Sequence, residues 1–398
     1  MLSVGQIIGW GTTFYLPAVM AEDMARDLGM ARELVFLGVS LMVAIAALLS
    51  PACGRLMDRL GAGVFLPLGS LLIGAGLLQF AALPTVAGSF LAWTLFGLAT
   101  PLALSLAGVT LLTQLSGAEA RRNIAVLMLF TGLSASVFWP IASVLERAFA
   151  WRGAIAVFAG LNLLLALPLH VGLAVISRRE LAARGPATAR TPGVAPRLPL
   201  RLRRRAQYLM LIAFSLQGLG SWGLPLHVIS LFQQLGLSTA AAVGIAALNG
   251  PATIAARLLE VALGGRVQPI TTAVIAAAHV PIACLFLLAP IDAGLAATAF
   301  TVVFFGANGV MSVLRATLPL TLLGSHGYGA LMGSLALPQN LVIAASPYLF
   351  ASAFHAAGTL AGALLALALS VAAFLTVVSL AATVRAGSGE PGQGAERA

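Results

Sequence analysis

Long apolar runs separated by short polar loops dominate the sequence. Most runs reach the ~20 residues that a helix needs to cross the ~30 Å hydrocarbon core of a bilayer. A backbone in that core must pair its polar groups within its own segment, which favours helices over open strands. We therefore predict an all-α polytopic membrane protein with twelve transmembrane helices. The expected spans are 3–20, 33–53, 62–83, 87–113, 123–145, 152–176, 208–232, 239–262, 269–290, 293–318, 328–351 and 357–383.

One long polar segment divides the chain near its midpoint. Residues 177–207 are rich in Arg, Pro and Ala and have no apolar period, which indicates a linker. The predicted organisation has two six-helix bundles, the linker between them and a disordered cytoplasmic tail. These parts cover residues 1–176 (first bundle), 177–207 (basic cytoplasmic linker), 208–384 (second bundle) and 385–398 (tail).

An internal repeat supports the division into two halves. Leu16–Met30 (LPAVMAEDMARDLGM) and Leu224–Ser238 (LPLHVISLFQQLGLS) share a Leu-Pro and, at the same spacing, a Leu-Gly. Further along, Gly54–Asp58 (GRLMD) aligns with Ala256–Glu260 (ARLLE). Because the two matches occur in the same order in both halves, we expect the bundles to be pseudo-symmetric.

The arginines set the expected orientation. The composition, 60% hydrophobic and 9% charged, excludes an ordinary soluble domain. All 22 basic residues are Arg, and they give a net charge of +10. Seventeen of them lie in the loops after even-numbered spans, the linker and the C-terminus, against four on the opposite side. This asymmetry places both termini in the cytoplasm and explains the charge through the bilayer rather than a nucleic-acid partner.

Several classes of chemistry find no support in the sequence. It has no GxxxxGK[ST] loop, which argues against ATP-driven transport. Cys53 and Cys284 have neither metal-ligand nor disulfide spacing, and the five histidines are scattered. The linker is too short for a signalling domain. We therefore expect no enzyme activity, catalytic residue, metal or cofactor, and we expect a monomer in the membrane.

The most specific motif follows the second span. Gly54–Gly61 (GRLMDRLG) resembles the loop between helices two and three of the major facilitator superfamily, although Ala62 and Gly63 stand where that family usually has basic residues. The run Arg315–Gly333 (RATLPLTLLGSHGYGALMG) is similar to one found in many bacterial members. The resemblance implies an inner-membrane transporter that works by alternating access. It also implies a gating role for Gly54, Asp58, Arg59 and Gly61, with the Asp58 carboxylate against a helix N-terminus or an arginine.

An arginine in the eighth span has two interpretations. A charge inside the bilayer marks a functional site by default. Gly250 followed by Arg257 also resembles the monocarboxylate and oxalate/formate-type branches of the superfamily, which implies contact with a substrate carboxylate. Alternatively, Arg257 pairs with Glu260 at i,i+3 as a gating latch, matching Asp58 in the repeat. Both interpretations remain open.

Polar residues on several spans predict a polar transport path. In the tenth span, Asn308, Ser312 and Arg315 share one helix face. Arg315 either takes part in gating or extends to the cytoplasmic boundary. Gln339 and Asn340 follow Pro338, either at a broken-helix site or as partners of the carbonyl that Pro338 frees. The candidate binding residues are Arg257, Asn308, Ser312, Gln217, Trp222, Tyr15, Thr13, Gln339 and Asn340; Glu260 and Arg315 join the gating set.

These features favour a secondary transporter that moves a small molecule or ion, with an organic or inorganic anion as one candidate cargo. A drug or toxicant efflux permease of the same fold is the alternative. A non-transporting receptor or a membrane enzyme is the rival of another class. The coupling ion and the direction of transport are left open by the sequence.

Overall fold

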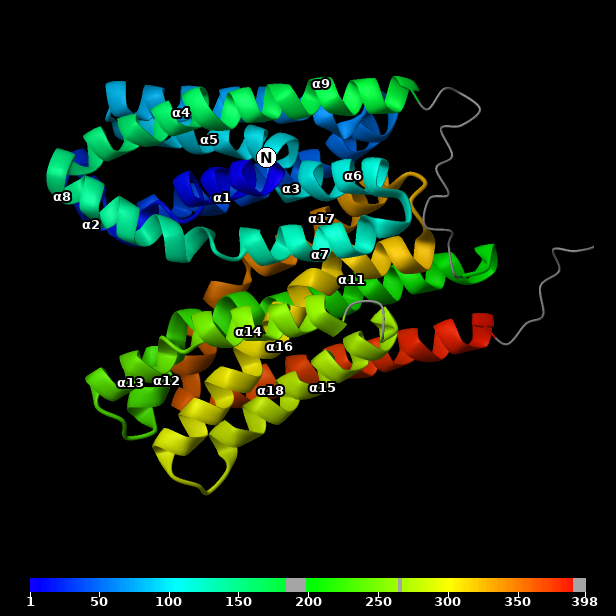
Figure 1. The fold of residues 1–398 in the computed structure, drawn as a ribbon. Coiled ribbons are helices and arrows are strands. Elements are labelled where there is room, and N and C mark those ends of the chain that lie inside the picture. The colour runs from blue at the N-terminus through cyan, green and yellow to red at the C-terminus, as the bar shows by residue number, and fades with distance from the viewer. Residues whose placement is uncertain (184–197, 264–266, 389–398) are drawn as a thin grey trace, which may run out of the picture. The chain divides into compact units, whose positions relative to one another are not determined.

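The computed structural model describes residues 1–183, 198–263 and 267–388, and every helix or strand element assigned in these ranges is a helix (Figure 1). Parts of the predicted linker and tail lie outside the described residues. All twelve predicted spans are helical, apart from short turns. The predicted fold class is confirmed.

The helices gather in two compact units. The first contains the helices of the first half together with one from the second half, α17. Its helices are α1 (Leu2–Thr12), α2 (Pro17–Leu28), α3 (Arg32–Leu60), η1 (Ala62–Val64), α4 (Phe65–Ala82), α5 (Val86–Ala103), α6 (Ser105–Ser116), η2 (Gly117–Glu119), α7 (Ala120–Thr131), α8 (Ser134–Leu161), η3 (Asn162–Ala166), α9 (Leu167–Ala183) and α17 (Tyr328–Ala344).

The second unit contains the other helices of the second half. They are α11 (Leu200–Gly223), η4 (Leu224–His227), α12 (Val228–Gln234), α13 (Thr239–Ala246), α14 (Asn249–Leu263), α15 (Pro269–Leu288), α16 (Ala293–Leu323) and α18 (Ser346–Ser388). The predicted boundaries of the two bundles, at residues 176 and 208, remain a prediction.

Eight helical runs in the described part of the chain are long and apolar enough to cross a membrane. Two of them, Val86–Thr131 with 46 residues and Pro140–Ala183 with 44, are long enough for two crossings each at ~20 residues a crossing. The predicted spans 3–20, 208–232 and 328–351 are not among these eight runs. The first and last of the three consist of shorter helices, whereas α11 in the middle one has 24 residues but is less apolar.

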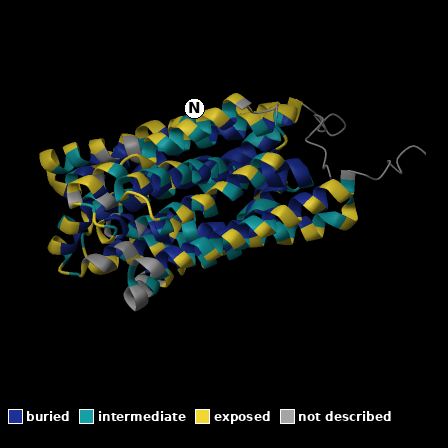
Figure 2. Cartoon of the chain, turned by 90° about the horizontal axis from the view of Figure 1, so that it is seen from below, coloured by how far each residue is buried: buried dark blue, intermediate teal, exposed yellow. Residues whose placement is uncertain are grey.

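Each unit has an apolar interior and an apolar exterior. Unit 1 is centred on aromatic side chains that include Trp93, Trp151 and Phe158, and unit 2 has two apolar clusters. Exposed residues recur along the helices (Figure 2). They include large apolar side chains, for example Leu164 at 81% and Leu48 at 62%. Such exposure would be costly in water, whereas lipid covers it without cost.

Backbone breaks separate several of the predicted spans. Ala150 has φ 54° and ψ 172° inside α8, which divides that run between the predicted spans 123–145 and 152–176. Gly358 has φ 64° inside α18, at the start of the last predicted span, 357–383. By contrast, α17 continues through Pro338. The helix that carries Gln339 and Asn340 is therefore not broken at the proline.

Candidate functional site

The Asp58 carboxylate binds the N-terminus of α17. Asp58 lies in the last turn of α3, and its two oxygens accept hydrogen bonds from the backbone amides of Gly329, at 2.9 Å, and Ala330, at 2.7 Å. These amides belong to the first turn of α17, where no intrahelical acceptor is available. The negative charge also meets the positive end of the helix dipole. Of the two partners expected for Asp58, the structure shows the helix N-terminus.

Glycines allow α3 and α17 to lie this close. A Cβ atom added to Gly54 would overlap the carbonyl oxygen of Gly329, and one added to Gly333 would overlap that of Ser50. Any side chain at these positions would therefore push the two backbones apart. Gly54 was among the predicted gating residues. Gly329 and Gly333 were visible only as members of a family-like run, because their contact with α3 depends on the tertiary fold.

A side chain from α6 holds the turn that follows Asp58. Gly61 ends α3 with φ 87°, a conformation that favours glycine. Gln114 donates to the Met57 carbonyl at 3.0 Å and accepts from the Ala62 amide at 2.9 Å. Gln114 thus fixes the end of α3, a role that sequence reasoning missed. Arg59 is exposed beside this turn.

A second cluster of polar side chains joins α11 and α16 in unit 2. Arg315 donates from Nη2 to Gln217 Oε1 at 2.7 Å. The Gln217 amide nitrogen donates in turn to Asn308 Oδ1 at 2.6 Å, and the Ser221 hydroxyl donates to the same oxygen at 2.7 Å. Gln217 is only 7% exposed. The cluster brings together two predicted binding residues, Gln217 and Asn308, with Arg315, which was predicted to act in gating.

Arg257 reaches the same helix from α14. Its Nη2 donates to Ser312 Oγ at 2.9 Å, and its Nε donates to the Gly309 carbonyl at 3.4 Å. One turn earlier on α14, the Thr253 hydroxyl donates to the Phe305 carbonyl at 3.2 Å, which fixes the two helices against each other. Because Ser312 and Arg315 are three residues apart, two arginines lie along adjoining parts of one α16 surface.

Glu260, the proposed partner of Arg257 in the latch interpretation, is buried on α14 with 7% exposure. The contacts of Arg257 with Gly309 and Ser312 show that its guanidinium is held on α16. They leave the choice between substrate binding and a latch to experiment.

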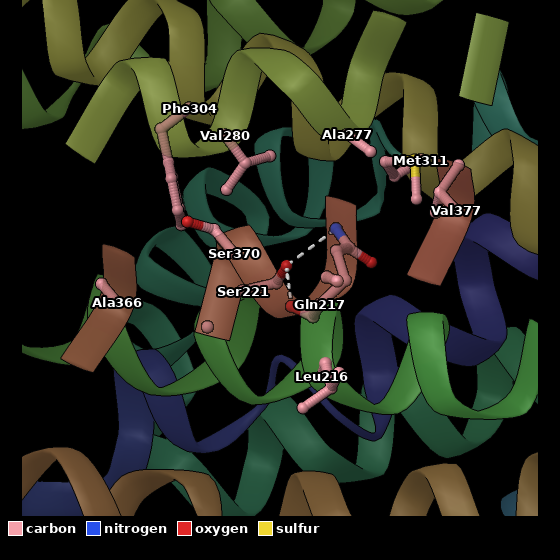
Figure 3. Close-up of a pocket in the computed structure, with 12 residues that line it drawn as sticks. Leu216, Gln217, Ser221, Ala277, Val280, Phe304, Met311, Ala366, Ser370 and Val377 are labelled. Atoms are coloured by element: carbon pink, nitrogen blue, oxygen red, sulfur yellow. Dashed lines mark hydrogen bonds between the residues drawn. The ribbon is translucent and has the colours of Figure 1, made fainter. Parts of the chain in front are cut away.

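A small cavity borders the α11–α16 cluster. Its volume is about 20 Å³, enough for a water molecule. Gln217 and Ser221 of α11 line it (Figure 3), and residues of α15, α16 and α18 line it as well, including Val280, Met311 and Ser370. The cavity therefore provides space next to the hydrogen-bonded amide of Gln217.

The other predicted binding residues are spread over both units. Thr13 is buried and donates to the Gly9 carbonyl at 2.6 Å, while the Tyr15 ring packs edge-on against Phe14. Trp222 is 41% exposed on α11, whereas Gln339 is buried and Asn340 partly buried on α17 in unit 1. Their binding roles remain predictions. Among the described residues, no group of three or more His, Cys, Asp or Glu side chains could hold a metal ion.

Comparison with known proteins identifies the family. The sequence profile of the Major Facilitator Superfamily matches residues 2–347. The chain belongs to this superfamily. It is thus a multi-pass membrane protein of a superfamily whose members carry small molecules across membranes, and it is a transporter rather than an enzyme.

Solved transporters of the superfamily share the fold at low sequence identity. The human organic anion transporter MFSD10 is 15% identical, with 94% of this chain and 97% of that chain covered and a TM-score of 0.68. The proton:xylose symporter XylE is 13% identical, with 96% and 94% covered and a TM-score of 0.69. FucP in its outward conformation is 13% identical, with 95% and 97% covered and a TM-score of 0.66. None of the curated proteins compared matches the sequence significantly.

Proposed function

We propose that this protein is a secondary transporter that moves a small anionic solute across a bacterial inner membrane by alternating access, with both termini in the cytoplasm. The observation that carries the choice of an anion is the positioning of Arg257 and Arg315 along one surface of α16, together with Asn308 and Ser312. A guanidinium is planar and always charged, and inside a membrane protein it favours an anionic ligand.

The acidic residues of unit 2 strengthen this proposal. Its described part contains only Glu260 and Asp292 as acids. Asp292 caps the other end of α16 by accepting from the Leu295 amide at 2.9 Å, roughly 35 Å along the helix from Arg315. Arg257 and Arg315 together therefore outnumber Glu260, the remaining acid of the described part of unit 2. The similarity to MFSD10, an organic anion transporter, fits the same cargo class.

The contact between Asp58 and α17 supplies a gate in the proposed cycle. Opening the path on that side requires the carboxylate to leave the Gly329 and Ala330 amides. Hydrogen bonds to a charged group contribute about 1.5–3 kcal/mol each, so this contact is strong enough to favour one state and weak enough for solute binding to overcome. The two bundles then rock about a site near the membrane midplane, driven by a solute or ion gradient.

The test is flux in proteoliposomes that contain the purified protein. We expect saturable uptake or release of an organic anion or oxyanion, and we expect Arg257→Ala to lower it by ~10-fold or more because a charge-assisted contact is lost. Size-exclusion profiles must show that the variant is folded. Arg385→Gln, at the exposed cytoplasmic end of α18, is the matched control and should retain wild-type flux.

A folded wild-type protein that moves none of a broad set of organic anions and oxyanions would contradict the proposed cargo. Growth of a deletion strain on panels of solutes and toxicants would then separate an uncharged cargo from drug efflux, the alternative for the same fold.

A further inference from the structure

We propose that Arg315 is the anchor for the solute's anionic group and binds one carboxylate or other oxyanion through the Nε–Nη2 edge of its guanidinium. This inference rests on the proposed transport of an anion. It gives Arg315 a binding role in place of the gating role expected from the sequence.

The first step of the argument is the geometry of the guanidinium. Its Nε and Nη2 donors lie on one edge and are spaced to match the two oxygens of a carboxylate. In this protein Nη2 donates to Gln217 Oε1 at 2.7 Å. Nε is fully enclosed and has no hydrogen-bond partner among the described residues. Of the two donors on this edge, Nη2 is therefore bonded to a neutral amide oxygen, which occupies the place of one carboxylate oxygen, and Nε is not bonded.

The second step is the cost of leaving Nε in this state. A buried donor of a charged group without an acceptor destabilises the fold, so native proteins rarely keep one without a functional reason. No described acidic side chain forms an ion pair with Arg315. An anion from outside the chain would satisfy Nε, strengthen the contact at Nη2 and neutralise the charge.

The third step concerns Gln217 and its surroundings. Its amide is held through Nε2 by Asn308 Oδ1 and lies next to Ser221 Oγ at 2.9 Å. The cavity of about 20 Å³ adjoins both Gln217 and Ser221 (Figure 3), which gives the Gln217 side chain space to move when an anion takes its place. Gln217 is therefore a positioning residue that keeps Arg315 oriented until the solute arrives.

The decisive variant is Gln217→Glu. It places a carboxylate of the protein itself beside the guanidinium, at nearly the same size as the amide. The internal carboxylate should pair with Arg315 and exclude the anion of the solute. Gln217→Ala is the matched opposite, because it removes the competing oxygen and leaves the edge of Arg315 open.

Binding is measured as the thermal shift of the detergent-purified full chain with sodium acetate, benzoate, succinate, phosphate or sulfate, against chloride at equal ionic strength. We expect at least one of these anions to stabilise the wild type. For that anion, Gln217→Glu and Arg315→Gln should weaken the apparent affinity at least ~10-fold. Arg315→Lys, which keeps the charge and loses the planar edge, should weaken it less. Gln217→Ala removes the competing oxygen together with the contact that orients the guanidinium, so it should weaken the affinity clearly less than Arg315→Gln does. Arg385→Gln should match the wild type.

Three results would overturn the proposal. One is wild-type affinity in a folded Gln217→Glu protein. Another is an equal loss of anion affinity in Gln217→Ala and Arg315→Gln, which would indicate that the two side chains only hold α11 against α16. This comparison also tests the proposal if the Gln217→Glu protein does not fold. The third is no stabilisation of the wild type by any of the five anions. Transport of a neutral solute would then still support a secondary transporter, whereas absence of all flux would remove the proposed function itself.

Discussion

The Asp58 carboxylate acts as a helix cap supplied by another helix. Capping groups normally come from the residue that precedes the helix. Here the amides of Gly329 and Ala330 at the start of α17 receive theirs from the last turn of α3. A single side chain therefore couples the position of α17 to that of α3.

Substituting Asp58→Asn tests this coupling. The amide keeps one acceptor oxygen and loses the charge that interacts with the helix dipole, so we expect a loss of about 1–2 kcal/mol at the contact. Hydrogen exchange at the Gly329 and Ala330 amides should become faster in the detergent-purified protein. Glu119→Gln is the control, because Glu119 is 67% exposed in its ion pair with Arg122. Unchanged exchange in Asp58→Asn would show that the carboxylate contributes little to holding α17.

The glycine contact between α3 and α17 gives a second test at the residue scale. In Gly333→Ala the new methyl group would overlap the Ser50 carbonyl, so we expect a clearly lower melting temperature and a cost of about 1–3 kcal/mol from overpacking. Gly160→Ala on α8 is the matched control, since nothing lies within 4 Å of its added Cβ. It should be neutral or stabilising, because alanine favours a helix more than glycine does. Equal melting temperatures for the two variants would refute the close contact.

At the scale of elements, interruptions of helices are satisfied by side chains from neighbours. The backbone leaves the helical conformation at Leu104, between α5 and α6. The carbonyl of Ala103 there accepts a hydrogen bond of 2.6 Å from Gln6 Nε2 on α1. Gln6 is fully buried, so α1 is tied to the break in the fourth span.

The substitution Gln6→Leu should therefore destabilise unit 1. It keeps the approximate size of the side chain and leaves the Ala103 carbonyl without this donor, which costs about 1–3 kcal/mol for a buried polar group. Thermal unfolding followed by circular dichroism measures the effect. Gln6→Glu, which replaces the donor with an acceptor, should be at least as harmful. Unchanged thermal unfolding in both variants would show that the hydrogen bond from Gln6 to the Ala103 carbonyl does not stabilise unit 1.

The elements also show what the sequence could predict. The apolar runs predicted every helical span, because in lipid the backbone has no alternative to the helix. The GRLMDRLG motif predicted that Asp58 meets a helix N-terminus or an arginine. It could not name α17, since that partner is 271 residues away along the chain. The face of Asn308 and Arg315 was predicted from its spacing, but the role of Gln217 as their bridge depends on how α11 packs against α16.

At the scale of the whole molecule, the chain's halves and its compact units do not coincide. The repeat and the linker predict a division between residues 176 and 208. By contacts, however, α17 groups with the helices of the first half. Hydropathy cannot show that α17 packs with the first half, because an apolar helix has the same pattern whichever neighbours it packs against.

The packing of α17 with the helices of the first half has a consequence for how the protein is made. Asp58 and its second partner, Ala330, are separated by 272 residues. At ~5–20 residues per second, a ribosome needs on the order of 15–50 s to make that stretch. During this time the surface of α3 around Gly54 and the Asp58 carboxylate lack their contacts with α17. Any insertion factor or lipid that shields this surface during synthesis must leave before α17 can take its place, so the contact between Asp58 and α17 forms among the last steps of biogenesis.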